Sequence, residues 1–442
     1  MSEPTDLRAV TAELVYVNGA FRRDTSIVLA ADRIVDVCAR DEVPPGAGID
    51  NWGPVAIVPG TVNAHGHAFQ NLFKGIADDR TFESWRDDVL YPLSATLDRD
   101  AIYVGSLFAF AEALAAGVTS TTDFFYLHDE SNENAEAVID AAHDIGIRLV
   151  FARAFYDRDA PPAAPARYRE DATDAAQRTR ALAQKYRNDP LVSVQPAPHS
   201  LHAASPETIA VALEVARELE VGCHLHLAEA RYEVDLVVDR FAATPVRLLH
   251  REGVLDERLI CIHSVWLDDE ELDLIADAGA GIVHCPGANA FLGDGLARLR
   301  SMLDRRIAVA LGPDGGCANN RQSVFDEMRT ATLIAKAIAT DGSAIDAETA
   351  FGLGTIAGAR MLGLQAGAIE AGTFADLVAL DLTDLSLQPT SAIEKNVVNS
   401  MQQTAIDRVM VGGEVVWEDG RPTRIDPAEL RDRVATVTSR FH

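Results

Sequence analysis

Lysine is nearly absent from this chain, and basic residues of both kinds are few. The 442 residues include 39 lysines and arginines against 67 aspartates and glutamates, which gives a net charge of −28 at pH 7. The only lysines are Lys74, Lys185, Lys336 and Lys395. Nucleic acids and anionic membrane surfaces would repel such a chain, so we expect neither as a partner. An acidic, lysine-poor surface is typical of proteins from a cytoplasm with a high salt concentration. A GC-rich genome with an acidic bias would produce the same composition.

The sequence also lacks long apolar runs and paired cysteines. No stretch approaches the roughly 20 apolar residues that span a bilayer, and the N-terminus has no basic-then-apolar signal pattern. The cysteines form no close pair and no metal-type spacing; they are Cys38, Cys223, Cys261, Cys285 and Cys317. We expect ordinary buried thiols without disulfides. With 48% apolar and 24% charged residues, the chain has the composition of a soluble globular protein, and a cytoplasmic location is expected.

Short apolar runs alternate with amphipathic segments from residue 55 onward. This alternation indicates βαβ units with parallel strands. Eight runs have the length and composition of strands: Val55–Asn63, Val118–Phe125, Arg148–Phe155, Val192–Pro198, Val221–Leu227, Leu259–His263, Gly281–Cys285 and Ile307–Gly312. Alanine-rich periodic segments such as Tyr103–Ala116 and Pro206–Leu219 lie between them. Eight strands favour a closed (β/α)₈ barrel of the α/β class over an open doubly wound sheet.

Both ends of the chain contain further β-type segments. Residues 8–54 have the pattern of a β-meander with a turn at Asn18-Gly19. Similar runs return at Ala375–Asp381 and Val409–Val416. Because these pieces bracket the barrel, we predict one small β-sandwich built from both termini. The predicted segments are sandwich residues 1–57, the barrel at 58–364, and further sandwich residues with a C-terminal helix at 365–442.

Histidines and carboxylates stand at the ends of several predicted strands. The first predicted strand leads into His65 and His67, and residues i and i+2 of a strand point to the same face. Later strand ends carry His224, His226, Glu229, His263 and Asp314. In a closed barrel the carboxyl ends of the strands all face one rim. Three histidines and one aspartate there would make a nitrogen and oxygen site for Zn²⁺ or Fe²⁺ with one position left open for water.

The succession of these residues resembles the amidohydrolase superfamily, and within it the aminohydrolase and chlorohydrolase branch. The motifs that carry the resemblance are His65-x-His67, His226-x-x-Glu229, His263 and Asp314. Similar segments cover most of the chain: Leu72–Asp79, Pro198–Ser200, His284–Asn289, Asp326–Arg329 and Gly372–Val378. The branch includes cytosine, guanine and methylthioadenosine/S-adenosylhomocysteine deaminases. The resemblance therefore implies a metal-dependent hydrolase that deaminates a nitrogen heterocycle or an amidine and releases ammonia.

The resemblance also implies which residues bind the metal. One divalent ion, Zn²⁺ or alternatively Fe²⁺, would be held by His65, His67, His226 and Asp314. Members of the superfamily with two metal ions usually carry a bridging lysine at the fourth strand, and Val192–His199 contains no lysine. The implied site is mononuclear.

Proton transfer is assigned by the same resemblance. His263 and Asp314 would orient or deprotonate the water that the metal activates. Glu229 would protonate a ring nitrogen of the substrate and later pass a proton to the leaving group. The spacing to Glu229 selects His226 as the metal ligand and leaves His224 as a structural residue.

Five residues are candidates for contact with the substrate: His199, Glu83, Trp85, Arg153 and His284. Two of them, Glu83 and Trp85, match positions that contact ribose and base in adenosine-type deaminases, although the start of a helix explains them nearly as well. A salt bridge is an equally good explanation of Arg153. The loop Ala160–Ala166, after the third strand, is long enough to act as a lid. We expect a small-molecule substrate and a homo-oligomer of two or more chains.

Two substrate classes stay open. Ala197–Leu201 and Leu292–Gly295 are similar to formimidoylglutamate deiminases, but His202 stands where those enzymes have an arginine for the substrate carboxylate. Gly75–Asp79 favours nucleoside-type deaminases, and so does the asparagine pair in Ala318–Asn320, where alanine replaces the usual serine. An s-triazine hydrolase or chlorohydrolase is a further alternative. Outside enzymology, a catalytically silent barrel that acts in assembly would lack metal ligands, and this chain has them all.

Overall fold

Eight parallel strands form a barrel at the centre of the computed structural model, which describes residues 7–129, 131–158 and 164–441. The barrel strands are β8 (Thr61–Asn63), β9 (Val118–Phe125), β10 (Arg148–Phe155), β11 (Val192–Pro198), β12 (Cys223–Leu227), β13 (Leu259–His263), β14 (Gly281–His284) and β15 (Val309–Leu311). Hydrogen bonds join β8 to β11 in one run of neighbours and β12 to β15 in another. The two runs meet where Ser200 pairs with His226. The predicted α/β barrel is thus confirmed.

The barrel closes between its first and last strands through a close approach of two backbones. The Ala64 amide donates to the Leu311 oxygen at 3.0 Å, and the Asp314 amide donates to the His65 oxygen at 3.1 Å. A Cβ atom at Gly312 would lie only 2.8 Å from the backbone nitrogen of His65. Glycine at this position therefore allows the contact that brings two predicted metal ligands to one side of the barrel.

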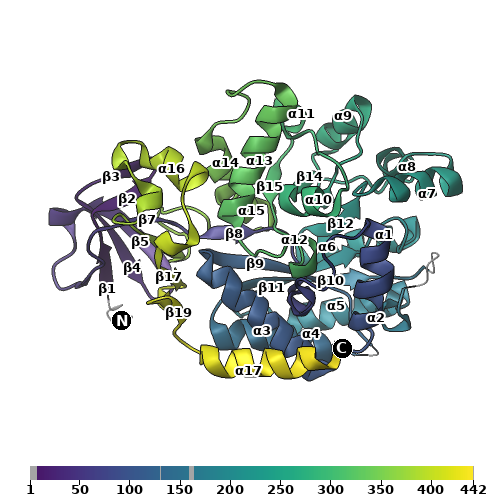
Figure 1. Cartoon of the computed structure of the whole chain (residues 1–442), viewed down its shortest axis with the longest axis horizontal. Helices are drawn as coiled ribbons and strands as arrows, with labels where there is room; N and C mark the ends of the chain where they lie inside the picture. The colour runs from purple at the N-terminus through teal and green to yellow at the C-terminus, as the bar shows by residue number, and fades with distance from the viewer. Residues whose placement is uncertain (1–6, 130, 159–163, 442) are drawn as a thin grey trace.

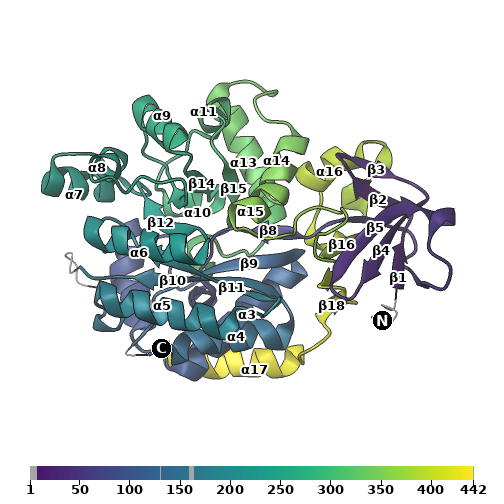
Figure 2. The ribbon, with the colours of Figure 1, turned by 180° about the vertical axis from the view of Figure 1, so that it is seen from behind.

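Helices that follow the strands in the sequence surround the barrel (Figure 1). They are α3 (Arg99–Ala115), α4 (Glu133–Ile145), α5 (Ala172–Tyr186), α6 (Pro206–Leu219), α7 (Arg231–Phe241), α8 (Pro245–Arg251), α9 (Asp269–Ala278), α10 (Pro286–Leu292), α11 (Leu299–Asp304) and α13 (Val324–Ala339). Figure 2 shows α3 to α6 across one face of the molecule. Their starts follow ordinary capping chemistry, because Asp98 accepts from the Ala101 amide of α3 and Ser205 from the Thr208 amide of α6.

Two sheets form the β-sandwich predicted from both termini. One contains β1 (Leu7–Thr11), β4 (Thr25–Ala30), β5 (Arg33–Ala39) and β6 (Gly48–Asn51). The other contains β2 (Leu14–Val17), β3 (Ala20–Arg22), β7 (Val55–Pro59), β16 (Leu377–Asp381), β17 (Ile406–Val411), β18 (Glu414–Glu418) and β19 (Arg421–Pro422). Buried side chains of both sheets, among them Val10, Ile57 and Met410, make a small core separate from that of the barrel. The turn between β2 and β3 has positive φ at Asn18 and Gly19, as the sequence predicts.

Some predicted strand boundaries are wrong. The run Val55–Asn63 is two strands, because β7 pairs with β16 in the sandwich and β8 pairs with β9 in the barrel, with Gly60 between them. Three other strands are shorter than predicted: β12 begins at Cys223, β14 ends at His284 and β15 covers only Val309–Leu311. Apolar runs alone do not show where the hydrogen-bonded ladder of the barrel begins and ends.

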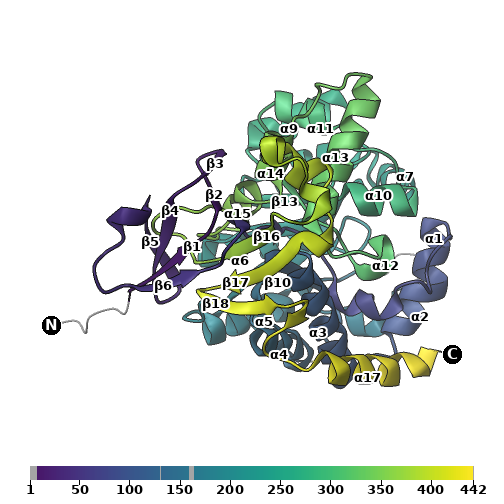
Figure 3. The same ribbon diagram turned by 60° about the vertical axis from the view of Figure 1, so that its left-hand side comes forward.

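The last helix, α17 (Pro427–Thr438), lies along α3 on the outside of the barrel rather than on the sandwich (Figures 1 and 3). Arg433 pairs with Asp100 of α3 at 2.8 Å, and the Phe441 ring packs against Phe73 with centroids 5.4 Å apart. The C-terminal segment thus joins the two parts of the molecule.

The remaining elements are short, and several stand at the mouth of the barrel. The segment after β8 contains η2 (Ala68–Phe73), α1 (Phe82–Ser84), the π-helix η3 (Trp85–Leu90) and α2 (Tyr91–Ser94). Later come α12 (Gly316–Asn319), α14 (Ala347–Leu353), α15 (Ile356–Met361) and α16 (Ile393–Asn399). Most of the predicted lid loop, residues 160–163, lies outside the described residues. Among the helices of the described residues, none is both long and apolar enough to cross a membrane.

Candidate active site

Four histidines and an aspartate converge at the carboxyl end of the barrel. They are His65, His67, His226, His263 and Asp314, and each is at least 95% buried. The prediction that the first pair shares one face of a strand is wrong in detail, because β8 ends at Asn63. The chain bends after β8 instead, and the two rings meet edge to face with centroids 4.8 Å apart.

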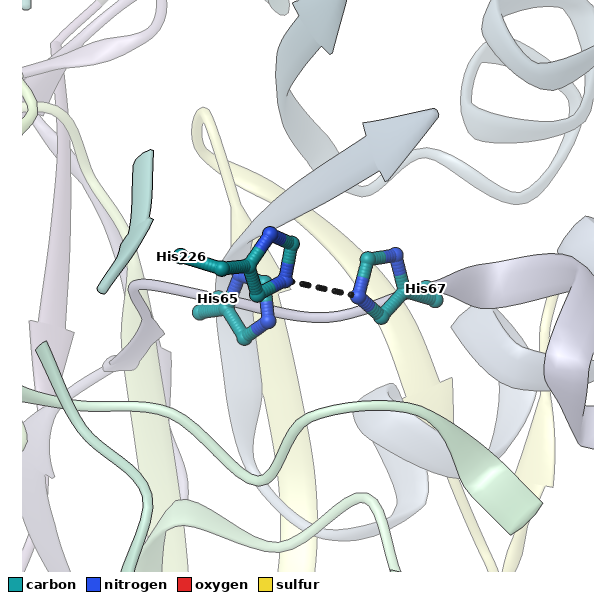
Figure 4. A group of neighbouring side chains, drawn as sticks. All are labelled: His65, His67 and His226. Atoms are coloured by element: carbon teal, nitrogen blue, oxygen red, sulfur yellow. Dashed lines mark hydrogen bonds between the residues drawn. The ribbon is translucent and has the colours of Figure 1, made fainter. Parts of the chain in front are cut away.

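Three of these histidines turn ring nitrogens toward one point (Figure 4). Nδ1 of His67 donates to the Phe124 oxygen at 2.6 Å, and Nδ1 of His226 donates to the His199 oxygen at 2.8 Å. With their protons on Nδ1, the neutral rings present Nε2 lone pairs to each other at 3.3 Å. Two such lone pairs repel each other unless a cation lies between them, and a backbone carbonyl on the other ring nitrogen is usual for a histidine that binds metal.

The distances among the donor atoms fit a small divalent ion. Nε2 of His65 and of His67 lie 3.3 and 3.5 Å from Oδ1 of Asp314. Ligands of a tetrahedral ion with bonds of about 2.0–2.1 Å are about 3.3 Å apart. Within the described part of the chain, both ring nitrogens of His65 lack a hydrogen-bond partner. Burial lowers the pKa of His65, His67 and His226, which keeps the rings neutral as metal ligands must be.

His263 and Glu229 stand directly beside this cluster. Nε2 of His263 is 3.4 Å from Oε1 of Glu229 and 4.0 Å from Oδ2 of Asp314. His263 also belongs, with His65 and Asp314, to a second group of atoms close enough to hold an ion. Burial raises the pKa of Glu229 well above its usual range, and the carboxylates of Asp294 and Asp314 raise it further. A carboxyl group that keeps its proton near neutral pH can act as a general acid.

The backbone around these residues is strained. Ala228, His263, Ser264 and Asp314 have φ values of 50°, 68°, 52° and 67°, in the left-handed region that non-glycine residues rarely adopt. All four lie at or just after the carboxyl ends of β12, β13 and β15. Strained residues persist only where the surrounding structure holds them, and they gather at functional sites.

A pocket opens directly over the cluster. The space inside it that no atom fills is about 550 Å³, including the part open to solvent. Its aromatic wall consists of Phe82, Trp85, Tyr91, Tyr126, Tyr168 and Tyr232. His67, His226, Glu229, His263 and Asp314 form its floor. The pocket therefore offers flat apolar faces next to metal-type ligands and the carboxyl of Glu229.

Two of the predicted substrate contacts line this pocket. His199 does so with its Nδ1 3.0 Å from the Ser200 hydroxyl. Trp85 also lines it, and its Nε1 donates to the Cys317 oxygen at 3.0 Å. Both side chains are fixed by hydrogen bonds and are available for contact with a ligand.

The structure does not bring the other three predicted contacts to the wall of the pocket. Glu83 is exposed at the start of the short helix α1. Arg153 is fully buried, and it forms a two-armed ion pair with Glu170 at 2.7 and 3.1 Å and a bond to Asn132. Its side chain faces the helices, because alternate residues of a strand point to opposite faces. His284 is buried at the end of β14 and is not among the residues that line the pocket.

Sequence reasoning missed most of the wall. Gln70, Arg86 and Tyr91 come from the short helices after β8, which have no periodicity long enough to recognise. Tyr168 and Tyr232 come from segments after β10 and β12. Tyr126 could have been found, because it directly follows β9 and therefore stands at the same rim as the metal-type ligands.

Comparison with known proteins agrees with this geometry. Residues 56–416 match the model of the amidohydrolase family. A 5-methylthioadenosine/S-adenosylhomocysteine deaminase from Moorella thermoacetica is 30% identical over 436 residues, which cover 97% of each chain. The enzyme of the same name from Thermodesulfovibrio yellowstonii is 33% identical over 381 residues, 86% of this chain and 84% of that one. A solved structure, an adenosine deaminase from Xanthomonas campestris with bound zinc, has a TM-score of 0.89 and 27% identity over 98% of each chain.

Proposed function

Because the chain belongs to the amidohydrolase family, we propose that it deaminates a planar amino-substituted heterocycle of the purine nucleoside type, using one divalent metal ion. The observation that carries the proposal is the convergence of His65, His67, His226 and Asp314, of which the last three line the floor of one aromatic pocket together with Glu229. A flat ring held between aromatic side chains would present its edge to that floor.

The four ligands would hold the ion, with Zn²⁺ as our assignment and Fe²⁺ as the alternative. Imidazole nitrogens with one carboxylate oxygen suit either ion. When bound, the ion supplies Lewis-acid chemistry and lowers the pKa of water toward neutrality. Oδ1 of Asp314 faces the histidines, whereas its Oδ2 lies toward His263. One carboxylate can therefore serve as a ligand through Oδ1 and accept a proton through Oδ2.

Glu229 would carry the proton that the substrate needs. Its raised pKa lets it enter the reaction as an acid and protonate a ring nitrogen next to the carbon under attack. Asp314 would accept the first proton of the incoming water, and Glu229 would take the second proton from the added hydroxyl and pass it to the amino group, which leaves as ammonia. A carbonyl then remains on the ring, and the proton on Asp314 returns to Glu229. His263 stands within 3.4 Å of Glu229 and would orient the attacking water.

The names of the relatives and the aromatic wall favour a purine nucleoside as substrate. One observation favours a second class, a linear amidine with an acidic group such as N-formimidoyl-glutamate. The guanidinium of Arg86 belongs to the pocket wall and lies over the Tyr232 ring at 4.9 Å. It could pair with a substrate carboxylate in place of Asp87, which it contacts at 2.6 Å.

Ammonia release by the zinc-loaded protein tests the proposal. The panel contains adenosine, 5′-methylthioadenosine, guanine, cytosine, pterins, s-triazines and N-formimidoyl-glutamate. Turnover of an adenine nucleoside supports the first class, and turnover of N-formimidoyl-glutamate alone replaces it by the second. Release of ammonia from no compound would contradict deamination and direct the search to chloride or amine leaving groups.

On the substrate found, Glu229→Gln should lower kcat by about 10²–10⁴-fold while the bound zinc stays at one equivalent. Glu218→Gln is the matched control, because Glu218 is 51% exposed on the outer helix α6. Near-wild-type turnover by Glu229→Gln would refute the proton-carrier role.

A further inference from the structure

The amide of Asn289 lies between His263 and a second buried carboxyl group, that of Asp294. Nδ2 of Asn289 is 3.1 Å from Nδ1 of His263 and 3.3 Å from Oδ2 of Asp294. The three side chains are between 1% and 4% exposed. Asn289 takes part in none of the proposed proton transfers, and Asp294 enters them only by raising the pKa of Glu229. Their hydrogen bonds reach Nδ1 of His263, whereas Nε2 of the same ring lies toward Glu229 and Asp314.

The backbone fixes the position of both side chains. Asn289 lies in α10, and Gly293 ends that helix with a φ of 74°. The Asp294 amide then donates back to the Asn289 oxygen at 3.0 Å. Nε1 of Trp266 also donates to the backbone oxygen of Asp294 at 2.8 Å. The turn Leu292–Gly295 therefore presents the Asp294 carboxyl to the Asn289 amide.

The carboxyl of Asp294 determines which way the amide is turned. An amide nitrogen carries two protons and no lone pair, and in this structure Nδ2 of Asn289 donates to Oδ2 of Asp294. The second proton of Nδ2 is then directed to Nδ1 of His263. The opposite orientation of the amide would give up the hydrogen bond from Nδ2 to Asp294. Nδ1 of His263 must then be an acceptor, and the proton of the neutral ring is on Nε2.

We propose that Asn289 and Asp294 are positioning residues that set the tautomer of His263 and make it a hydrogen-bond donor toward the reacting atoms. Its Nε2 proton points to Glu229 Oε1, 3.4 Å away, and toward Asp314 Oδ2, 4.0 Å away. A neutral His263 in this tautomer has no free lone pair in the pocket. Of the two roles that the resemblance leaves to His263, orienting or deprotonating the water, it performs the first, and Asp314 accepts the proton. This inference rests on the proposed function only in placing the reacting water beside His263.

Exchanging the two residues tests the proposal. The double variant Asn289→Asp/Asp294→Asn keeps the atom count, the net charge and a complete chain of hydrogen bonds. The direction of these hydrogen bonds is reversed, because a carboxylate at 289 accepts from Nδ1 of His263 and the amide at 294 donates to that carboxylate. The proton of His263 should move from Nε2 to Nδ1. The ¹⁵N shifts of the ring in histidine-labelled, zinc-loaded protein report the tautomer, and His263→Gln identifies the signals among the 12 histidines.

In the exchanged variant we expect the reversed tautomer, one equivalent of zinc, KM within about threefold of wild type, and kcat lower by about 10²–10⁴-fold, the range for a misplaced catalytic proton. Wild-type protein with the proton of His263 on Nδ1 would overturn the proposal, and so would a reversed tautomer with full kcat. The NMR result needs no substrate, so it separates this inference from the failure of the proposed function.

If the exchanged protein does not fold, a second variant tests the proposal. Asp294→Leu removes the carboxyl that turns the amide, and the surrounding α10 turn is kept. The amide can then rotate, so we expect signals of both His263 tautomers and a kcat lower by about threefold to tenfold. A single, unchanged Nε2–H tautomer in Asp294→Leu would show that Asp294 does not set the orientation, and would refute its part of the proposal.

Discussion

Asp376→Ala should strongly destabilise the protein, because it breaks a buried ion pair between the barrel and the sandwich. Arg148 begins barrel strand β10, and Asp376 directly precedes sandwich strand β16. Two nearly parallel contacts join them, Nε to Oδ2 and Nη2 to Oδ1, both at 3.0 Å. The side chains are 2% and 1% exposed. Oδ1 of Asp376 also accepts from the Gly412 amide at 2.7 Å.

The expected loss follows from burial. Removing one partner of a buried pair leaves an uncompensated charge and costs about 3–5 kcal/mol, and the unpaired Gly412 amide adds about 1 kcal/mol. Arg180 and Glu218 form a matched control with the same two-armed geometry, at 2.6 and 2.9 Å. They are 41% and 51% exposed, so Glu218→Ala should cost less than about 1 kcal/mol. The two variants differ mainly in the solvent around the pair.

Urea unfolding followed by tryptophan fluorescence and circular dichroism measures both losses. The double variant Arg148→Met/Asp376→Leu should recover at least half of the stability lost in Asp376→Ala, since apolar replacement of a whole buried pair is often neutral. Asp376→Ala within 1 kcal/mol of wild type would refute the reasoning. An equal loss in Glu218→Ala would refute it as well, because burial would then not be the cause.

The remaining predictions concern the metal and a buried acid. Chelation should lower the melting temperature, since an ion present at 100 times its Kd adds about 2.7 kcal/mol to stability. In His226→Ala, chelation should no longer change the melting temperature. An unchanged melting temperature in the chelated wild-type protein would contradict the metal site. Burial raises the pKa of Glu327 from 4.5 to about 7. The folded state thus binds the proton more tightly, and this stabilisation is complete below pH 4.5 and is lost as the pH rises through 7. Relative to wild type, Glu327→Gln should therefore gain up to about 3 kcal/mol in urea unfolding between pH 4.5 and 8, and parallel pH profiles for the two proteins would exclude this.

The residues on the floor of the site could be predicted from the sequence, because a closed parallel barrel has the carboxyl ends of all its strands at one rim. Once the apolar runs indicated eight parallel strands, residues directly after them had to share one rim. His226 and His263 lie at such ends, and the chain returns Asp314 to the same rim after β15. The ligand positions depend on strand order, and strand order follows from the pattern. The exact course after β8, which turns His65 against His67, does not.

The wall of the pocket could not be predicted in this way. Trp85 and Arg86 come from a π-helix of six residues, whose orientation is set by tertiary packing and not by periodicity. Arg153 shows the limit of the strand-end rule, because position along a strand does not state which face a side chain takes. Its guanidinium faces Glu170 and Asn132 at the starts of the neighbouring helices. An arginine at a strand end lines the pocket only if its side chain points to the same face of the strand as the metal-type ligands do.

The residues that stabilise the protein and the residues of the candidate site lie at opposite ends of the barrel. The Arg148–Asp376 pair stands at the amino end of β10, where the sandwich packs. The strained residues His263, Ser264 and Asp314 stand at the carboxyl ends, and each left-handed residue costs of order 1 kcal/mol. The rigid barrel has to sustain that strain. Asp376→Ala should therefore lower the stability of the whole protein while kcat at 25 °C stays near that of wild type, because the loss is made at the end that holds no substrate.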